Sequence, residues 1–220
     1  MKNGLDGLDF LKFNFSKDVL SGDYSDREKT AIQTEQLISI ENLDSNSIVI
    51  DIGANHGEVE RVLSNIGCKI YAFEPHPLFF SMLEDNYGNN PNIVLSDSAV
   101  WKSDEDRNFY FKRSASALNG GATLMAEKTN ITDLNLHVKV QCIDISRLVH
   151  SIDGDIDVLK MDVEGAEYEI LERLIETDSY KKIKSIYLED HSRKMPSNRF
   201  KNLKNQVLES CNKKNINLYW

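Results

Sequence analysis

The residues best suited to chemistry are a turn that contains two glycines and an acid that follows it. The turn separates a short β-branched run from an amphipathic stretch, and the acid, Glu74, ends the next apolar run. Glycines let the backbone approach a ligand, and the helix after such a turn presents unpaired N–H groups to it. A carboxylate at that place can accept hydrogen bonds from both hydroxyls of a ribose. The pattern predicts a nucleoside site formed by Asp51, Gly53, Ala54, Asn55, His56, Gly57, Glu74, Pro75 and His76.

The turn also indicates which nucleoside it could hold. Dinucleotide sites have the pattern GxGxxG, whose second glycine makes room for a pyrophosphate, and this chain has Asn55 there. A ligand with an amino-acid group in place of phosphates fits better, because Asp51 and the turn can bind its ammonium and carboxylate groups. S-adenosylmethionine (SAM) is such a ligand. The alternatives are an NAD-dependent oxidoreductase, which would need the missing glycine, and a non-catalytic binding module, which would lack Glu74 or the turn glycines.

Two later apolar runs end in groups that could act on a substrate. Lys160 and Asp162 close one run, and Glu189 and His191 close the next. The ends of parallel strands meet at one edge of an open α/β sheet, so we expect these side chains to gather there. Methyl transfer from a sulfonium is an in-line displacement that depends on alignment, and a hydroxyl acceptor needs a base or a metal. We expect Asp162 near the methyl group and the acceptor hydroxyl, with His191 or Glu189 as the base.

Some of these residues also have ordinary structural interpretations. Lys160 lies inside a buried run, where it could be half of a structural ion pair, and His191 could be a cap or a solvated residue after its strand. Asp162, Glu189 and His191 could together offer two oxygens and a nitrogen to Mg²⁺ or Mn²⁺. No spacing requires such an ion, so we expect no metal.

The order of apolar runs and amphipathic stretches predicts an α/β fold. The runs 47–52 and 69–73 flank a stretch with apolar residues at helical spacing, which is typical of a βαβ unit with parallel strands. Residues 114–133, rich in Ser, Ala, Gly, Asn and Thr, predict a long loop or lid. We expect residues 1–45 to form a partly helical extension and residues 46–220 one domain. Further strands are expected at 93–95, 109–111, 138–140, 156–162, 185–189 and 216–220, and helices at 30–43, after Pro77, and around 166–175 and 203–211.

Composition excludes several classes of protein. The chain has 220 residues and a formal net charge of −9, and an acidic total argues against a nucleic-acid partner. No run approaches the roughly 18 apolar residues of a membrane span, and the N-terminus lacks a secretory signal pattern. Three cysteines without a CxxC pair predict neither a disulfide framework nor a zinc ribbon. We therefore expect a reduced, cytoplasmic protein.

The charge is unevenly distributed along the chain. Residues 1–180 carry 16 basic and 32 acidic side chains, whereas residues 181–220 carry 10 basic and 3 acidic ones. The ordinary interpretation is a solvated helix face. The alternative is that Arg193, Lys194 and Arg199 receive an anionic acceptor, which would make binding weaker as salt rises.

Three segments of the chain resemble the FkbM-type SAM-dependent methyltransferases: Asp51–Gly57, Phe73–Pro75 and Asp157–Glu167, the last of which contains DVEGAE. The resemblance extends from about residue 35 to 192. It implies a class I methyltransferase fold, which is a Rossmann-like, doubly wound, mostly parallel sheet in three α/β/α layers. It also implies SAM as methyl donor and O-methylation of a hydroxyl on a sugar, a glycan or a small secondary metabolite.

The resemblance assigns roles to individual residues as well. Little chain follows the last expected helix, which leaves little room for the terminal β-hairpin usual in class I methyltransferases. We expect the last strands to be rearranged, or completed by a second copy in a homo-oligomer. The residues that match family positions are Gly53, Ala54, Asn55 and Gly57 in the SAM loop, Glu74 as the ribose acid, Asp97, Ser98 and Ala99 in the turn that meets the adenine, and Asp162 and Glu164 after the fourth strand.

Overall fold

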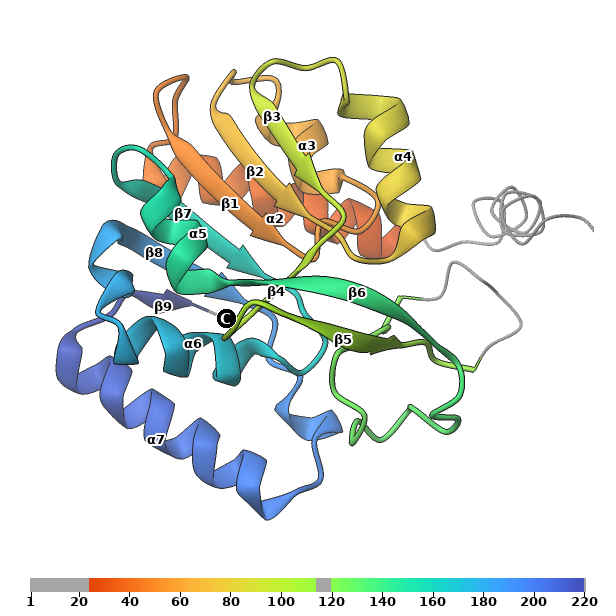
Figure 1. Cartoon of the computed structure of the whole chain (residues 1–220). Helices are drawn as coiled ribbons and strands as arrows, with labels where there is room; N and C mark the ends of the chain where they lie inside the picture. Colours follow the sequence, from red (N-terminus) through yellow and green to blue (C-terminus); the bar gives the residue numbers. More distant parts are fainter. Residues whose placement is uncertain (1–23, 114–119, 220) are drawn as a thin grey trace, which may run out of the picture.

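The computed structural model describes residues 24–113 and 120–219. Its centre is a six-stranded sheet in the order β3-β2-β1-β7-β8-β9, in which all neighbouring strands are parallel (Figure 1). The chain winds outward from β1 in one direction and from β7 in the other, so the strand order reverses between these two. The strands are β1 (Ile48–Ile52), β2 (Lys69–Phe73), β3 (Ile93–Ser96), β7 (Ile156–Met161), β8 (Ile183–Leu188) and β9 (Leu218–Tyr219).

Helices cover both faces of this sheet. Successive residues of a strand point to opposite faces, and here Val49 and Val158 pack with α3 and α4, whereas Ile50 and Leu159 pack with α5, α6 and α7. The expected doubly wound sheet in three α/β/α layers is confirmed. The helices are α3 (Glu58–Leu63), α4 (Pro77–Tyr87), α5 (Ile145–Ser151), α6 (Glu167–Glu176) and α7 (Asn198–Lys214).

A second, three-stranded sheet in the order β4-β6-β5 packs on the α6 side, where Trp101 and Phe109 join the larger core. Only short strands at 109–111 and 138–140 were expected in this region, and β4 and α5 were missed. The segment of β5 reads EDRNFY, which is mostly polar, and β4 is too short for a periodic pattern. The strands are β4 (Ala99–Trp101), β5 (Glu105–Tyr110) and β6 (His137–Asp144).

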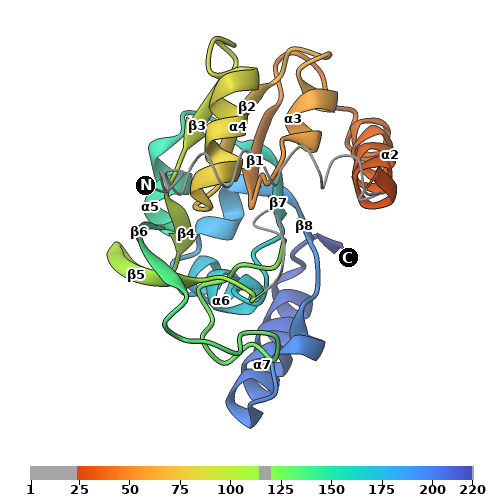
Figure 2. The same ribbon diagram turned by 90° about the vertical axis from the view of Figure 1, so that its right-hand side faces the viewer.

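The helix expected at 30–43 is α2 (Tyr24–Glu41), which lies beside α3 (Figure 2). The Glu41 carboxylate accepts hydrogen bonds from Ser185 Oγ at 2.9 Å and Tyr187 Oη at 2.5 Å on β8. Residues 1–23 lie outside the described part of the chain, and the domain boundary near residue 45 stays a prediction.

The closing strand expected at 216–220 is β9, which pairs parallel to β8. In the described residues the main sheet ends at the parallel pair β8 and β9. Of the expected loop 114–133, residues 120–133 contain no helix, and Thr123 forms an isolated bridge with Tyr110. Across residues 24–113 and 120–219, no helix is both long and apolar enough to cross a membrane.

Replacing Phe200 tests how much α7 contributes to the stability of the core. Its side chain is fully buried and meets the ring of Tyr168 edge-on at a centroid distance of 5.6 Å. Phe200→Ala should lower the free energy of unfolding by about 3–5 kcal/mol, because it leaves a cavity in a packed interior. Lys201→Ala, at the next and exposed position of α7, should change it by less than about 0.5 kcal/mol. Urea denaturation measures both, and equal effects would show that α7 is not part of the core.

Candidate active site

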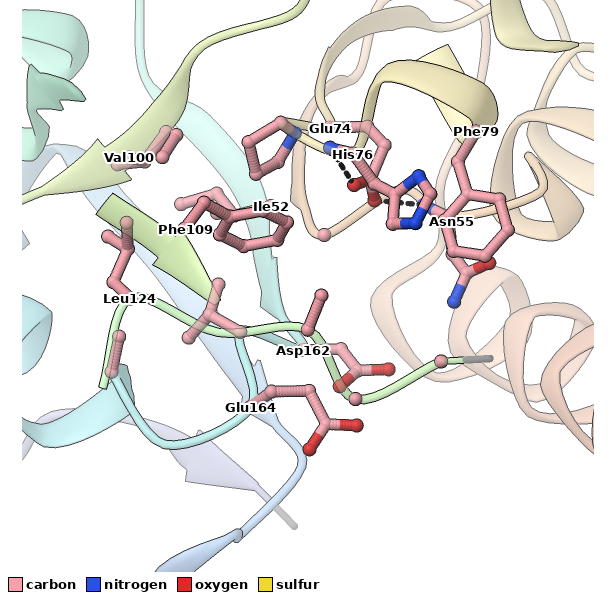
Figure 3. Close-up of a pocket in the computed structure, with 18 residues that line it drawn as sticks. Ile52, Asn55, Glu74, His76, Phe79, Val100, Phe109, Leu124, Asp162 and Glu164 are labelled. Atoms are coloured by element: carbon pink, nitrogen blue, oxygen red, sulfur yellow. Dashed lines mark hydrogen bonds between the residues drawn. The ribbon is translucent and has the colours of Figure 1, made fainter. Parts of the chain in front are cut away.

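A pocket lies beyond the carboxyl ends of β1, β2 and β7, where the strand order reverses (Figure 3). This is the place where open α/β sheets bind ligands. It has about 610 Å³ of empty space, part of it open to solvent. Eight of the expected site residues line it: Gly53, Asn55, Glu74, Pro75, His76, Ala99, Asp162 and Glu164.

The backbone of the glycine turn is packed tightly against the end of β7. Gly53 has φ +83°, and a Cβ there would lie 1.9 Å from the carbonyl oxygen of Asp162. The N–H groups of Gly53 and Ala54 both donate to the carbonyl of Phe73, at 2.9 and 3.1 Å. Asp162 N–H donates in turn to Ile52 O at 2.9 Å. These bonds tie the ends of β1, β2 and β7 together, and only glycine fits at position 53.

Glu74 is held by the backbone on both sides. Its carboxylate accepts hydrogen bonds from Asn55 N at 2.8 Å and from His76 N at 2.7 Å (Figure 3). Asn55 has a left-handed backbone, with φ +51°, at the point where its N–H meets this carboxylate. Glu74 is 5% exposed, and burial raises its pKa to about 7 although the two N–H groups oppose this. The acid is therefore oriented in the pocket wall before any ligand arrives.

An aromatic wall stands beside Glu74. The ring of His76 stacks on Phe79 at a centroid distance of 4.3 Å, and His56 meets the same phenyl ring at 4.4 Å. His76 Nδ1 accepts a hydrogen bond from Leu78 N at 3.3 Å and so caps α4. Burial lowers the pKa of His76 to about 4, so this ring is neutral at pH 7.

Asp51 and Lys160 form an ion pair beneath the pocket and do not line it. Lys160 Nζ lies 3.1 Å from Asp51 Oδ1, and the Asp51 side chain is fully buried. Burial opposes the charge on Lys160, but Asp51 and Asp162 outweigh this and raise its pKa. Fully buried Glu60 lies near the pair, and burial together with the charge of Asp51 raises the pKa of Glu60 well above its usual range. The geometry corresponds to the structural ion pair considered for Lys160, and its catalytic role stays a prediction.

The end of β8 carries a buried histidine among carboxylates. His191 is 3% exposed, and its Nδ1 lies 2.8 Å from Glu167 Oε1. Its Nε2 lies 3.2 Å from Glu164 Oε2 and 3.4 Å from Glu189 Oε1. Asp162 Oδ1 is also near, at 3.9 Å from Nε2. Lys160, Glu189 and His191 therefore lie behind or beside the pocket wall, and of the four expected catalytic residues only Asp162 lines it.

The charges of this group depend on one another. Burial lowers the pKa of His191, but the hydrogen bonds with Glu167 and Glu189 and the charges of Glu167 and Glu164 outweigh burial and raise it to about 10. The hydrogen bond with His191 lowers the pKa of Glu189. Burial raises the pKa of Asp162 to about 6 although Lys160 opposes it. Without further ligands the His191 ring is therefore an imidazolium at neutral pH.

The described part of the 114–133 loop is attached to the pocket. Thr123 Oγ1 donates to the carbonyl of Glu164 at 2.8 Å. Lys128 has a fully buried side chain, and its Nζ contacts Gly121 O at 2.9 Å and the carboxylate of Glu164. Sequence patterns did not indicate Lys128, because a lone lysine in a polar loop carries no periodic signal. Glu164 was matched only through the DVEGAE motif.

The other expected residues lie around the pocket rather than in its wall. Ser98 is buried and Asp97 is exposed, on the connection between β3 and β4. In the basic segment, Lys194 pairs with Glu164 at 3.2 Å, and Arg199 pairs with Glu169 at 2.5 Å. The lining residues that sequence reasoning did not assign are Ile52, Phe79, Val100, Phe109, Gly120, Gly121, Ala122, Leu124, Val163 and Ala166.

The sheet order and the pocket at its reversal define an α/β protein of the class I methyltransferase type. The chain belongs to the FkbM methyltransferase family, because the model of the methyltransferase FkbM domain matches residues 51–213. It is 25% identical over 156 residues to the hexuronic acid methyltransferase AglP of Haloferax volcanii. The matched region covers 70% of this chain and 59% of AglP. The chain therefore spans about three fifths of the length of this relative.

Solved structures with a similar fold include other methyltransferases. One is a SAM-dependent O-methyltransferase from Thermotoga maritima, with a TM-score of 0.41, 12% identity, and coverage of 80% of this chain and 48% of that one. Another is a precorrin-6y C5,15-methyltransferase from Geobacter metallireducens, with a TM-score of 0.41 and 16% identity. This match covers 80% of this chain and 68% of that one.

Glu74 should make the stability of the protein depend on pH. Its pKa of about 7 in the folded state lies above its usual value of 4.5. Its stabilising contribution is full below that usual value and is lost as pH rises to about 7, at about 1.4 kcal/mol per unit of pKa difference. Glu74→Gln cannot ionise, so its free energy of unfolding should fall less steeply between about pH 5 and pH 8.

Urea titrations at several pH values measure this slope. Glu84→Gln, which removes an exposed carboxylate from α4, should keep the wild-type slope. The same slope in all three proteins would contradict the burial of an ionisable Glu74.

Proposed function

We propose that this methyltransferase uses SAM and methylates a hydroxyl group of a sugar or a small hydroxylated metabolite. The observation that carries the proposal is Glu74, a buried carboxylate oriented by two backbone N–H groups in the wall of a pocket at the sheet reversal. A carboxylate so placed suits the two hydroxyls of a ribose. Asn55 occupies the place where a dinucleotide site needs a glycine, which argues against NAD.

The residues around the pocket fit the parts of SAM. Gly53 keeps the turn free of side-chain atoms, and Glu74 binds the ribose. The rings of His76 and Phe79 offer a neutral, flat surface to the adenosine side of the ligand. When bound, SAM supplies a methyl group activated by its sulfonium. Asp162, at the end of β7, lies in the pocket wall and faces the acceptor hydroxyl.

Alignment and removal of the hydroxyl proton are the remaining tasks of the protein. Holding two reactants in line supplies on the order of 7–11 kcal/mol of the barrier. Of the two candidates, Glu189 is the proton acceptor, because its side chain is a carboxylate that is 65% exposed, whereas His191 is already protonated at neutral pH and its Nδ1 is held by Glu167. The proton passes from the acceptor hydroxyl to this carboxylate as the methyl group is transferred.

The acceptor we propose is a sugar that carries a carboxylate. The relative AglP is named a hexuronic acid methyltransferase, and the 181–220 segment of this chain is basic. Arg193 is exposed near the site, and Lys194 lies at Glu164 on the pocket wall. These cations attract an anionic acceptor, and the attraction should weaken as salt rises.

Binding of S-adenosylhomocysteine tests the role of Glu74. Glu74→Gln should weaken this binding by about 1.5–3 kcal/mol, because a hydrogen bond to a charged acceptor is lost. Isothermal titration calorimetry on the wild type should also show affinity rising with pH through about 7, as Glu74 ionises. In Glu74→Gln this rise should be absent, and in Glu84→Gln it should be retained.

Unfolding in the presence of each candidate ligand separates S-adenosylhomocysteine from NAD. S-adenosylhomocysteine at ~100 times its dissociation constant should raise the free energy of unfolding by about 2.7 kcal/mol, and NAD should not raise it. Stabilisation by NAD alone would overturn the proposal.

Transfer of labelled methyl from SAM to paired acceptors tests the acceptor class. A hexuronic acid should be methylated faster than the matching neutral hexose, with a KM that rises with salt concentration. The product should resist mild alkali, as an ether does. A product cleaved by alkali would be a methyl ester and would contradict hydroxyl methylation, and a KM independent of salt would contradict the anionic acceptor.

A further inference from the structure

The trio Asp162, Glu164 and His191 has the arrangement of a metal site. Each residue offers one ligand atom, and these atoms lie within 4.8 Å of one another. The three residues come from the ends of the adjacent parallel strands β7 and β8. Figure 3 shows the carboxylates of Asp162 and Glu164 directed to the same side of the pocket. Glu189, which sequence reasoning grouped with Asp162 and His191, is not part of the trio.

His191 is oriented as metal-binding histidines are. Its Nδ1 faces Glu167 Oε1, which also accepts a hydrogen bond from Gly165 N at 3.1 Å. A carboxylate only accepts hydrogen bonds, so Nδ1 carries a proton and Nε2 is directed toward Glu164 and Asp162. A second carboxylate that holds the far nitrogen of a histidine ligand is the usual support of such sites. His191 is 3% exposed, and its Nε2 lies 3.2 Å from Glu164 Oε2 and 3.4 Å from Glu189 Oε1.

The charges around the trio leave an excess of negative groups. Lys128, Lys194 and His191 Nε2 all lie near Oε2 of Glu164, and no ion pair to its Oε1 is found among the described residues. Even with His191 protonated, the described residues of the cluster hold one more carboxylate than cation. The carboxylates are Asp51, Asp162, Glu164, Glu167 and Glu189, and the cations are Lys128, Lys160, Lys194 and His191.

The geometry points to a divalent cation site formed by Asp162, Glu164 and His191 beside the pocket at the sheet reversal. Two carboxylates and one imidazole are a suitable donor set for Mn²⁺ and related ions. The cation would replace the proton on His191 Nε2, and Asp162 and Glu164, which line the pocket, would hold it at the pocket wall. The existence of the site does not depend on the proposed function, but the role of the ion does. In hydroxyl methylation the ion would bind the acceptor hydroxyl and lower the pKa of that hydroxyl.

Electron paramagnetic resonance with Mn²⁺ alone tests the site on the full chain. The signal of free Mn²⁺ should disappear with one ion bound per chain in the wild type. His191→Gln and Glu164→Gln should each weaken binding at least about tenfold, the scale on which even supporting residues act. Asp190→Asn is the matched control, because its carboxylate pairs with Lys204 and lies outside the trio; it should bind Mn²⁺ as the wild type does.

S-adenosylhomocysteine binding and thermal unfolding are measured on the same samples. His191→Gln should keep S-adenosylhomocysteine binding, because His191 does not line the pocket; if it does not fold, Glu164→Gln decides. No Mn²⁺ binding by a wild type that binds S-adenosylhomocysteine would overturn the cation site and leave the proposed function intact. Equal Mn²⁺ binding by the trio variants and Asp190→Asn would also overturn it, as adventitious binding. Mn²⁺ binding without S-adenosylhomocysteine binding would support the site and contradict the proposed function.

Discussion

The site depends on the close approach of two backbones at the point where the strand order reverses. The turn after β1 runs against the carbonyl of Asp162, and Gly53 leaves no room for a Cβ between them. The same turn reaches across to β2 through two N–H groups that share the carbonyl of Phe73. These contacts set the separation between Glu74 on one side of the pocket and Asp162 on the other. A ligand at the reversal is therefore held between two carboxylates whose backbones cannot move apart without breaking the sheet edge.

Buried charge is the second constraint, because a carboxylate away from water is unfavourable unless it is paired. Glu74 takes two backbone N–H groups, Asp51 takes Lys160, and Glu167 takes His191. Buried ion pairs add little net stability, but they keep side chains in one orientation. Oriented groups need not be ordered when a ligand binds, which improves affinity and alignment. The partners of the buried charged side chains at this sheet edge thus fix the orientation of these side chains more than they stabilise the fold.

The elements that could be predicted from the sequence are those with both faces buried or with strong turn signals. The runs that became β1 and β7 are apolar and β-branched, and the turn at Gly53 follows from local backbone chemistry. The small sheet was only partly predicted, because β5 is polar along most of its length and is a strand only through its pairing with β6. Lys128 could not be predicted at all, since its burial depends on Glu164, 36 positions away.

The sequence by itself determined the parallel α/β sheet, the glycine turn and the place of Glu74, because each follows from patterns over a few neighbouring residues. Only the tertiary structure decided which of the acids and bases at the strand ends share a site. It paired Lys160 with Asp51 and placed both Glu164 and Glu189 beside His191, with Glu164 also grouped with Asp162. The physical reason is that a buried charged side chain takes the orientation of its partner, and these partners come from other strands and from a loop distant in the chain.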